Sequence, residues 1–317
     1  MQGEGRIILG YRTSGNEEVE AWRNSLVRLD ARIEVRGWPD LGDPAEIDAV
    51  LCWKPPHGWL ASLPNLRLVQ SLGAGVDHVM SDPSYPRHVP LVRLVDPGMT
   101  LAMTQFVVCQ TLRLHLGDLH YRAAQAMGAW RQRGPPPTRR SVGVLGLGTL
   151  GLSCAQALRA LGFDVFGWSR KPKSVEGLSG CYHGSDGLKD FLARSEILVC
   201  LLPLTPQTQG ILDARAFAAL PHGAALINVG RGGHVVEPDL LAALETGQIS
   251  AAVLDVFAVE PLPADHPFWH HPRVVVTPHV AAHTHPDTAA TVIAANLAEL
   301  RKAAPVWAAR VDLDLGY

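Results

Sequence analysis

The sequence predicts an α/β protein built from two doubly wound parallel-sheet domains. Short apolar runs alternate with longer amphipathic segments over most of the chain, and this pattern is typical of strands buried on both faces of a parallel sheet. The runs form two series, separated by a long helical segment and a proline-rich breaker at Gly134–Pro137. The length of 317 residues also suggests about two domains.

The first series lies in the N-terminal part of the chain. The segments Arg6–Tyr11, Ala49–Trp53 and Arg67–Ser71 are predicted strands, and Asn16–Leu29 is a predicted helix with apolar residues at helical spacing. A long helical pattern then runs from about Met99 to Trp130. It fits packing within one subunit and equally fits an arm that packs on a second subunit.

The second series follows the proline-rich segment. Six further strands are predicted: Ser141–Leu145, Asp164–Trp168, Glu196–Leu201, Ala224–Val229, Ala251–Asp255 and Arg273–Thr277. Helical patterns lie between most of them, including Leu150–Leu161 and Pro238–Thr246. A last helix, from Asp287 to about Ala303, follows the final strand and can return to the first domain.

Composition excludes several classes of protein. Lys plus Arg is 28 and Asp plus Glu is 30, so the net charge is −2, and no global positive field indicates a nucleic-acid or membrane partner. No apolar stretch approaches the roughly 18 residues of a transmembrane helix, and the N-terminal apolar run is too short for a signal peptide. The five cysteines are scattered without a C-x-x-C pair, so we expect a cytoplasmic protein.

The most informative motif opens the second series. Gly146, Gly148 and Gly151 form G-x-G-x-x-G directly after a predicted strand and at the start of a predicted helix. Gly146 permits a tight turn, Gly148 lets a pyrophosphate approach the backbone, and Gly151 lets the helix pack closely on the strand. The helix N-terminus supplies free N–H groups to the phosphates. The motif therefore predicts a dinucleotide-binding site.

The next strand indicates which dinucleotide binds. An NAD site usually has an acid at the end of this strand, which accepts from the ribose 2′-OH. Here Ser169, Arg170 and Lys171 stand at that end, followed by Lys173, whereas Asp164 lies at the opposite end of the strand. These side chains suit a 2′-phosphate, so we favour NADP over NAD.

Three later segments place polar residues just beyond strand ends, where open α/β sheets bind ligands. Arg231 lies among glycines that leave room for a small anion, and its guanidinium suits a carboxylate. Glu260 beside His279 would favour the imidazolium form and make His279 a general acid. The other histidines near His279 lack a cysteine partner or an H-E-x-x-H spacing, so we expect no metal site.

Together these motifs resemble the D-isomer-specific 2-hydroxyacid dehydrogenases. The resemblance rests on Gly146–Gly151, Asn228–Gly232, Leu254–Pro263 and Thr277–Ala281, which occur in the family's order, and on Ser71–Asp77, which is similar to the family's substrate loop. It implies Arg231 as substrate anchor, Glu260 as the partner of the histidine, and His279 as acid/base.

The resemblance also implies a fold and a set of binding residues. A flavodoxin-like substrate domain would comprise residues 1–98 and 286–317, and a Rossmann dinucleotide-binding domain residues 99–285. Besides Arg231, the implied substrate-binding residues are Trp53, Leu72, Gly73, Ala74 and Gly75. The implied cofactor-binding residues are Gly146, Leu147, Gly148, Thr149, Leu150, Gly151, Ser169, Arg170, Lys171, Leu202, Pro203, Val229, Gly230, Asp255, His279 and Ala281, with Asp255 on the nicotinamide side.

Further details, among them Cys52–Pro56 and His234–Glu237, resemble a subgroup of that family. Its members are NADPH-preferring dimers that reduce glyoxylate and hydroxypyruvate. The expected function is therefore NADPH-dependent reduction of small 2-oxo acids by a homodimer. Two alternatives stay open: a dehydrogenase for a different or bulkier 2-hydroxy acid, and a dinucleotide-sensing scaffold without catalytic activity.

Overall fold

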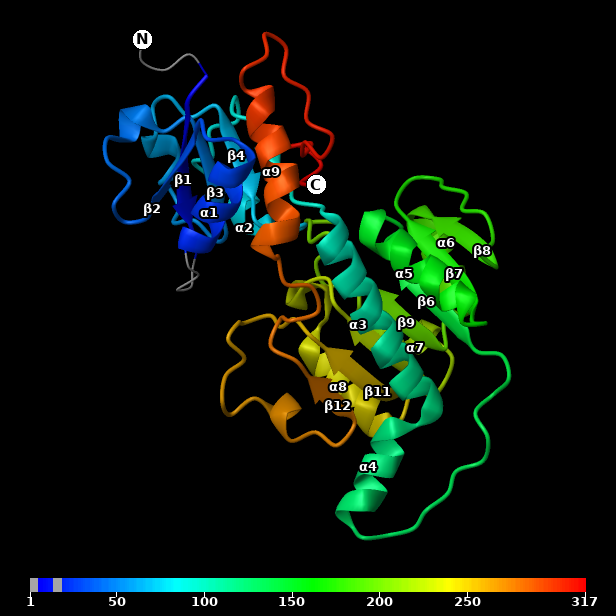
Figure 1. Cartoon of the computed structure of the whole chain (residues 1–317). Helices are drawn as coiled ribbons and strands as arrows, with labels where there is room; N and C mark the ends of the chain where they lie inside the picture. Colours follow the sequence, from blue (N-terminus) through cyan, green and yellow to red (C-terminus); the bar gives the residue numbers. More distant parts are fainter. Residues whose placement is uncertain (1–4, 14–18) are drawn as a thin grey trace. The chain divides into compact units, whose positions relative to one another are not determined.

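The structure, a computed structural model, describes residues 5–13 and 19–317. The chain divides into two compact units, Met1–Met99 with Thr284–Tyr317, and Thr100–His283. Figure 1 shows the course of the chain through both units. Among the described residues, none of the helices combines the length and the apolar character needed to span a membrane.

The first unit is built on a five-stranded sheet. Its strands are β1 (Ile7–Arg12), β2 (Ile33–Gly37), β3 (Ala49–Cys52), β4 (Leu68–Ser71) and β5 (Leu91–Val92). They are arranged in the order β2-β1-β3-β4-β5, and every neighbouring pair is parallel. This is the flavodoxin-like order, so the fold class expected for this part of the chain is confirmed.

Both faces of this sheet are covered. On one face Ile8, Val50 and Val69 share an apolar cluster with Trp59 and Leu60. The residues between them in each strand point to the opposite face because side chains alternate along a strand. On that face α1 (Val19–Leu29) and α9 (Pro286–Glu299) lie side by side (Figure 1). The short elements of this unit are η1 (Pro44–Glu46), η2 (Leu60–Ser62) and α2 (Asp77–Met80).

The second unit is built on a seven-stranded parallel sheet. Its strands are β6 (Ser141–Leu145), β7 (Asp164–Ser169), β8 (Gly180–His183), β9 (Ile197–Cys200), β10 (Ala224–Asn228), β11 (Ile249–Leu254) and β12 (Val274–Val276). The order is β12-β11-β10-β9-β6-β7-β8, with all neighbours parallel. The first strand, β6, thus lies inside the sheet beside β9, which is the Rossmann arrangement that the sequence predicts.

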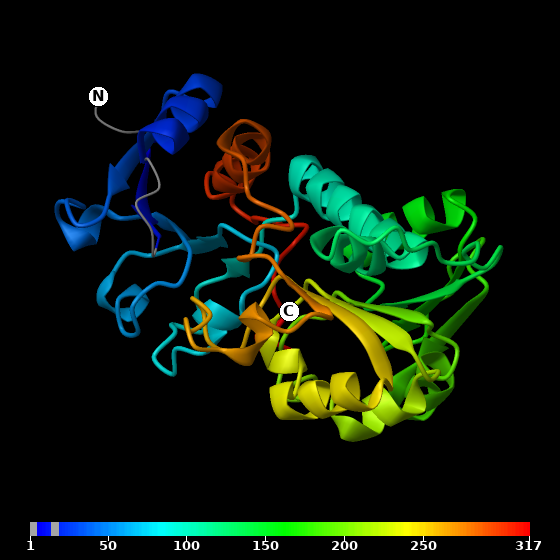
Figure 2. The same cartoon turned by 90° about the horizontal axis from the view of Figure 1, so that it is seen from below.

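Helices cover both faces of the second sheet, and the strand residues alternate between two apolar clusters. Val142, Val144 and Val199 pack with α3 and α5, whereas Leu198 and Leu226 pack with α6, α7 and α8. The helices are α3 (Pro97–Leu116), α5 (Thr149–Ala160), α6 (Gly184–Leu192), α7 (Ala214–Ala219) and α8 (Glu237–Thr246). Figure 2 shows α3 and α8 on opposite sides of this sheet.

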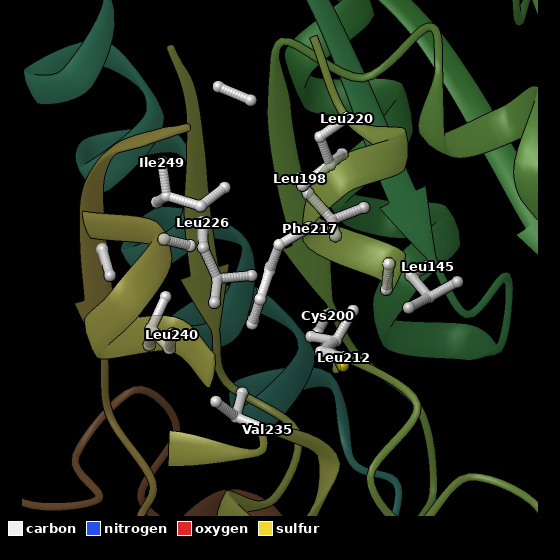
Figure 3. Packing of buried hydrophobic residues seen from close by; sticks show 14 of the residues in the cluster. Leu145, Leu198, Cys200, Leu212, Phe217, Leu220, Leu226, Val235, Leu240 and Ile249 are labelled. Carbon is white, nitrogen blue, oxygen red and sulfur yellow. The ribbon is translucent and has the colours of Figure 1, made fainter. Parts of the chain in front are cut away.

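The cluster on the α8 side is centred on an aromatic ring. Phe217 of α7 is almost fully buried and lies between Leu226 on one side and Leu198 and Cys200 on the other (Figure 3). Buried residues of β6, β7, β9, β10 and β11 and of α6, α7 and α8 together close this face. Because side chains pack closely on both faces of these strands, the positions at which the loops leave their carboxyl ends are fixed.

The prediction of one long helix over Met99–Trp130 is wrong in its extent. Helix α3 ends at Leu116, and α4 covers only Asp118–Ala126. Gly117 between them has a φ of +79°, a left-handed conformation that glycine adopts without steric cost and that ends a helix. Trp130 lies beyond α4 in a segment without regular secondary structure and is 91% exposed.

Other differences concern short or polar elements. Strands β2, β5 and β8 were not predicted, because β2 contains charged residues and β5 has only two residues. The last helix begins at Pro286 and ends at Glu299, before the expected end at Ala303. The predicted start of the first helix at Asn16 lies outside the described residues, and the helix is described from Val19.

Candidate active site

The polar residues singled out in the second unit follow strands that run in the same direction. Since all strands of this sheet are parallel, the segments after β6, β7, β9, β10, β11 and β12 emerge at one edge. These segments carry the glycine-rich turn, the basic residues and the candidate catalytic residues. The sheet therefore brings to one edge residues that are more than 100 positions apart in the sequence.

The glycine-rich turn joins β6 to α5, and two of its glycines have distinct structural reasons. Gly146 has a φ of +114° and donates its N–H to Trp168 O. A Cβ on Gly151 would lie 1.8 Å from Gly146 O, so any side chain there would separate helix and strand. Both glycines are thus required by the packing of the protein itself.

Gly148 differs from these two because the protein does not require it. Its φ is −75°, an ordinary value, and a Cβ there would meet nothing within 4 Å. Gly148 is also the N-cap of α5 and has no side chain that could cap the first N–H groups of the helix. An open backbone cradle at a helix N-terminus fits a pyrophosphate.

The end of β7 carries the basic residues. Ser169 is the last residue of β7 and donates its hydroxyl to Lys171 O at 2.8 Å, while Arg170 is half-buried. Lys173 reaches back to the glycine-rich turn and donates to Leu147 O at 2.6 Å. Asp164 begins β7 at the opposite edge, beside a hollow of about 260 Å³ that Arg194 and Glu196 also line. The carboxyl end of β7 is therefore basic and carries no acid.

Arg231 follows β10 in an extended conformation, with φ −145° and ψ 151°. Asn228, the fully buried last residue of β10, donates its amide to Arg231 O at 2.9 Å and accepts from Gly230 N at 3.2 Å. A Cβ on Gly232 would lie 1.8 Å from the carbonyl carbon of Phe257, so the Arg231 segment packs directly on the segment that leads to Glu260. The Arg231 backbone is consequently fixed by its neighbours, while its side chain is half-buried.

Glu260 and His279 form the contact that the sequence predicts. His279 Nδ1 lies 2.9 Å from Glu260 Oε2, and the two side chains are 34% and 20% exposed. The other carboxylate oxygen of Glu260 accepts from Phe257 N at 3.2 Å. Glu260 thus orients the imidazole through Nδ1, and Nε2 is the ring nitrogen on the opposite side.

His279 has a φ of +56°, a left-handed conformation that non-glycine residues rarely adopt. Asp255, which directly follows β11, holds this turn. Its carboxylate accepts from Thr277 Oγ1 at 2.6 Å, Val280 N at 2.9 Å and Ala281 N at 3.0 Å, and its own carbonyl accepts from His279 N at 2.8 Å. Asp255, expected on the nicotinamide side of a cofactor, is 1% exposed and therefore holds the turn that carries His279 from a buried position.

The segment expected to bind substrate lies in the first unit, after β4. A Cβ on Gly73 would lie 2.5 Å from the ring of Trp53, so this ring packs directly on the glycine. The Trp53 ring also lies 4.1 Å from that of His78, measured between centroids. In the part of the chain that the structure describes, no hydrogen bond engages the N–H groups of Ala74 and Gly75, whereas Gly73 N donates to Ser71 Oγ at 3.2 Å.

The remaining predicted residues follow strands of the second unit. Leu202 and Pro203 come after β9, Val229 and Gly230 after β10, and Ala281 two residues after His279. Leu202, Val229, Gly230 and Ala281 are buried. Over residues 5–13 and 19–317, no three histidine, cysteine or acidic side chains come together in a way that could hold a metal ion.

Sequence reasoning did not find the roles of Asn228 and Thr277. Both support a neighbour rather than a ligand: Asn228 holds the Arg231 backbone, and Thr277 binds the Asp255 carboxylate. A signal for Asn228 was present, because an amide at the end of an otherwise apolar strand needs hydrogen-bond partners.

Comparison with known proteins confirms the resemblance carried by the motifs. The family model "D-isomer specific 2-hydroxyacid dehydrogenase, NAD binding domain" matches residues 110–281, which is more than half of the chain. The chain belongs to the D-isomer specific 2-hydroxyacid dehydrogenase family. Members of this family are oxidoreductases, and the expectation of a dehydrogenase is confirmed at this level.

Curated relatives in the family cover almost the whole chain. Glyoxylate/hydroxypyruvate reductase A of Serratia proteamaculans is 44% identical over 304 residues, which is 94% of this chain and 96% of the relative. The protein of the same name from Yersinia enterocolitica is 41% identical over 306 residues, covering 95% of this chain and 97% of the relative.

Solved structures in the family have the same fold. A D-isomer specific 2-hydroxyacid dehydrogenase from Xanthobacter autotrophicus Py2, in complex with NADPH and MES, is 43% identical with a TM-score of 0.93, covering 99% of this chain and 100% of that one. An NADPH-dependent glyoxylate/hydroxypyruvate reductase from Sinorhizobium meliloti, in complex with NADP and sulfate, is 36% identical with a TM-score of 0.89, covering 98% and 100%.

Proposed function

We propose that this protein is an NADPH-dependent reductase of small 2-oxo acids, with glyoxylate and hydroxypyruvate as substrates. The observation that carries the proposal is the Glu260–His279 pair, 2.9 Å apart, at the sheet edge that also holds Arg231 and the glycine-rich turn. The family relatives named glyoxylate/hydroxypyruvate reductase, at 41–44% identity, support the choice of substrates.

In the second unit Arg231 would bind the substrate carboxylate, and in the first unit the loop after β4 is proposed to bind substrate. A guanidinium can grip a carboxylate with two parallel hydrogen bonds and polarise the neighbouring carbonyl. The N–H groups of Ala74 and Gly75 add donors that carry no side-chain bulk beyond a methyl group. Leu72 and the ring of Trp53 would form the apolar wall of a small pocket beside Gly73.

His279 would deliver the proton. When NADPH is bound, it supplies a hydride to the carbonyl carbon of the substrate. Charge then develops on the carbonyl oxygen, and His279 donates its Nε2 proton to it. Glu260 would accept from Nδ1 and so keep the ring oriented with Nε2 toward the substrate oxygen. Asp255 keeps the ring in place by holding the turn.

The residues at the sheet edge fit NADPH. Gly148 and the open N-terminus of α5 would take the pyrophosphate, with Leu147, Thr149 and Leu150 beside it. Ser169, Arg170 and Lys171 would take the 2′-phosphate, since this end of β7 has cations and no acid. The remaining contacts would come from residues after the other strands: Leu202, Pro203, Val229, Gly230, Asp255, His279 and Ala281.

Three wider features belong to the same proposal. The first unit would be the substrate-binding domain and the second the dinucleotide-binding domain. The protein would act as a homodimer, whose contact includes α4 with its half-exposed Tyr121. A cytoplasmic location is supported by five cysteines that are all free thiols.

One assay tests the reaction and the cofactor together. NADPH and NADH oxidation are followed with glyoxylate, hydroxypyruvate and a panel of larger 2-oxo acids. We expect turnover of the two small acids, and a higher kcat/KM with NADPH than with NADH. No turnover with any acid would contradict the reductase function. Turnover with the larger acids alone would support the alternative of a dehydrogenase for bulkier hydroxy acids.

A further inference from the structure

We propose that His234 is a positioning residue that holds the backbone of Arg231 at a fixed distance from the Leu202–Pro203 segment. It lies in the 3₁₀ turn η3 (Gly232–His234) and is fully buried, with 0% of its surface exposed. The inference rests on the proposed function, because it gives Arg231 the substrate carboxylate and Pro203 a place beside the cofactor.

The two ring nitrogens of His234 bind different segments of the chain. Nδ1 accepts from Arg231 N at 3.1 Å, and Nε2 lies 3.2 Å from Pro203 O. A backbone N–H can only donate and a carbonyl can only accept, so Nδ1 must be unprotonated and Nε2 must carry the proton. His234 is therefore a neutral imidazole in a single tautomer, and each of its nitrogens has a separate task.

The surroundings leave no freedom for this ring. A Cβ on Gly230 would lie 3.0 Å from His234 Cε1, so a side chain at position 230 would crowd the imidazole. Asn228 binds the other side of the same residue, donating to Arg231 O at 2.9 Å. The N–H of Arg231 is thus held by His234 and its C=O by Asn228, and the start of the Arg231 side chain is fixed between them.

An apolar side chain of the same size could fill this space but could not perform the task. It would remove the imidazole acceptor of Arg231 N–H, which is costly, and the imidazole donor to Pro203 O, which also accepts from Thr208 Oγ1 at 2.7 Å. Pro203 and the Arg231 backbone could then shift relative to each other, while backbone hydrogen bonds such as Leu212 N to His234 O at 2.9 Å would still join the two loops. Because catalysis depends on reacting groups held to within a fraction of an ångström, such a shift would weaken ligand binding and turnover.

Two amide variants separate the two tasks of the ring. In His234→Asn the side-chain amide lies near the position of Nδ1 and can accept from Arg231 N, but it is too short to reach Pro203. In His234→Gln the amide reaches the position of Nε2 and can donate to Pro203 O. His234→Phe keeps the bulk of the ring and removes both hydrogen bonds. The matched control is His222→Asn, because His222 is exposed and lies before β10.

We expect a split between the two ligands. His234→Asn should keep the KM for glyoxylate within about twofold of the parent and raise the Kd for NADPH about tenfold. His234→Gln should raise the KM for glyoxylate about tenfold and keep the Kd for NADPH within about twofold. His234→Phe should raise both constants and lower kcat, and His222→Asn should change neither. Steady-state kinetics give the KM values, nucleotide fluorescence gives the Kd for NADPH, and thermal unfolding shows that each variant is folded.

The inference would be overturned if both amide variants raised the KM for glyoxylate and the Kd for NADPH equally. It would also be overturned if every His234 variant kept the parental constants. The Kd for NADPH is measured without turnover, so it compares the two amide variants even if the parent reduces no 2-oxo acid. A parent protein that reduces no 2-oxo acid would contradict the proposed function. An active parent whose two amide variants do not differ in this way would contradict the role of His234 alone. If His234→Phe fails to fold, the two amide variants still decide.

Discussion

At the scale of single residues, the geometry of the proposed catalytic pair, Glu260 and His279, depends on the hydrogen bonds of Asp255. His279 has a left-handed backbone, a conformation that costs on the order of 1–3 kcal/mol and persists only where its surroundings enforce it. Asp255 supplies that enforcement with three hydrogen bonds to its carboxylate and one to its carbonyl. The imidazole is thereby presented to Glu260 in one orientation.

Removing the imidazole tests the role of His279. His279→Ala should lower kcat with glyoxylate by at least about 100-fold, because the developing oxyanion loses its proton donor. The affinity for NADPH, measured by fluorescence, should stay close to that of the parent. Glu260→Gln serves as the graded control, since it keeps a hydrogen-bond acceptor and loses the charge, and its kcat should fall by less. Loss of NADPH binding in a folded His279→Ala protein would contradict the assigned role.

The basic end of β7 carries the preference between cofactors. Arg170→Ala should raise the KM for NADPH about tenfold and leave the KM for NADH almost unchanged, because only NADPH offers a 2′-phosphate to the guanidinium. Steady-state kinetics with both cofactors measure the ratio of the KM for NADPH to the KM for NADH. Lys189→Ala is the control, since Lys189 is exposed on α6 and away from this edge. Equal changes for the two cofactors would argue against a 2′-phosphate contact.

At the scale of elements, the function depends on where parallel strands end. The loops after six strands of one sheet converge at one edge, and each loop has a separate task in the proposed reaction. The connection from β6 to α5 contains Gly146, Gly148 and Gly151 within six residues. A Cβ on Gly146 or Gly151 would collide with the backbone, whereas one on Gly148 would meet nothing within 4 Å.

This difference leads to a prediction with a built-in control. Gly151→Ala should lower the melting temperature of the free protein, since its Cβ would collide with Gly146 O. Gly148→Ala should leave the melting temperature almost unchanged, because its φ is ordinary and the space is open, but it should weaken NADPH binding by filling that space. Thermal unfolding and NADPH titration are measured for both variants. A stable Gly151→Ala protein would show that the helix can move away from β6 at little cost.

At the scale of the whole molecule, charge and burial are unevenly distributed. The net charge of −2 hides the local cluster of Arg170, Lys171 and Lys173 at the end of β7. The thiols are sorted by burial in a similar way. Burial raises the pKa of Cys52, Cys154 and Cys200 to about 12, whereas Cys109 is exposed on α3.

Thiol labelling tests this distribution. The thiolate is the reactive form, and a raised pKa means that almost none is present at pH 8 in the native protein. Cys52, Cys154 and Cys200 should therefore stay unlabelled by iodoacetamide until the protein is unfolded in urea, while Cys109 reports that the reagent is active. Mass spectrometry of the digested protein reads each site. Rapid labelling of Cys200 in the native protein would contradict the packing of the second sheet.

Local patterns in the sequence were sufficient for the fold class, the glycine-rich turn and the basic end of β7. Apolar strands, a glycine spacing and the absence of an acid are each contained within a few neighbouring residues, so no distant contact is needed to recognise them. The same patterns overestimated the helix after Met99, because the left-handed φ of Gly117 leaves no mark in the apolar spacing. They also missed β2, whose charged residues interrupt the apolar run.

The supporting contacts of the candidate site needed the tertiary structure. Glu260 and His279 are 19 positions apart, and the pairing was expected because both follow strands and because the family resemblance implies it. The bridge from His234 to Pro203 spans 31 positions, and the hydrogen bonds of Asp255 reach 26 positions along the chain. Such contacts depend on which strands are neighbours in the sheet and on their register. The burial of the whole sheet sets both, and no short stretch of sequence contains that information.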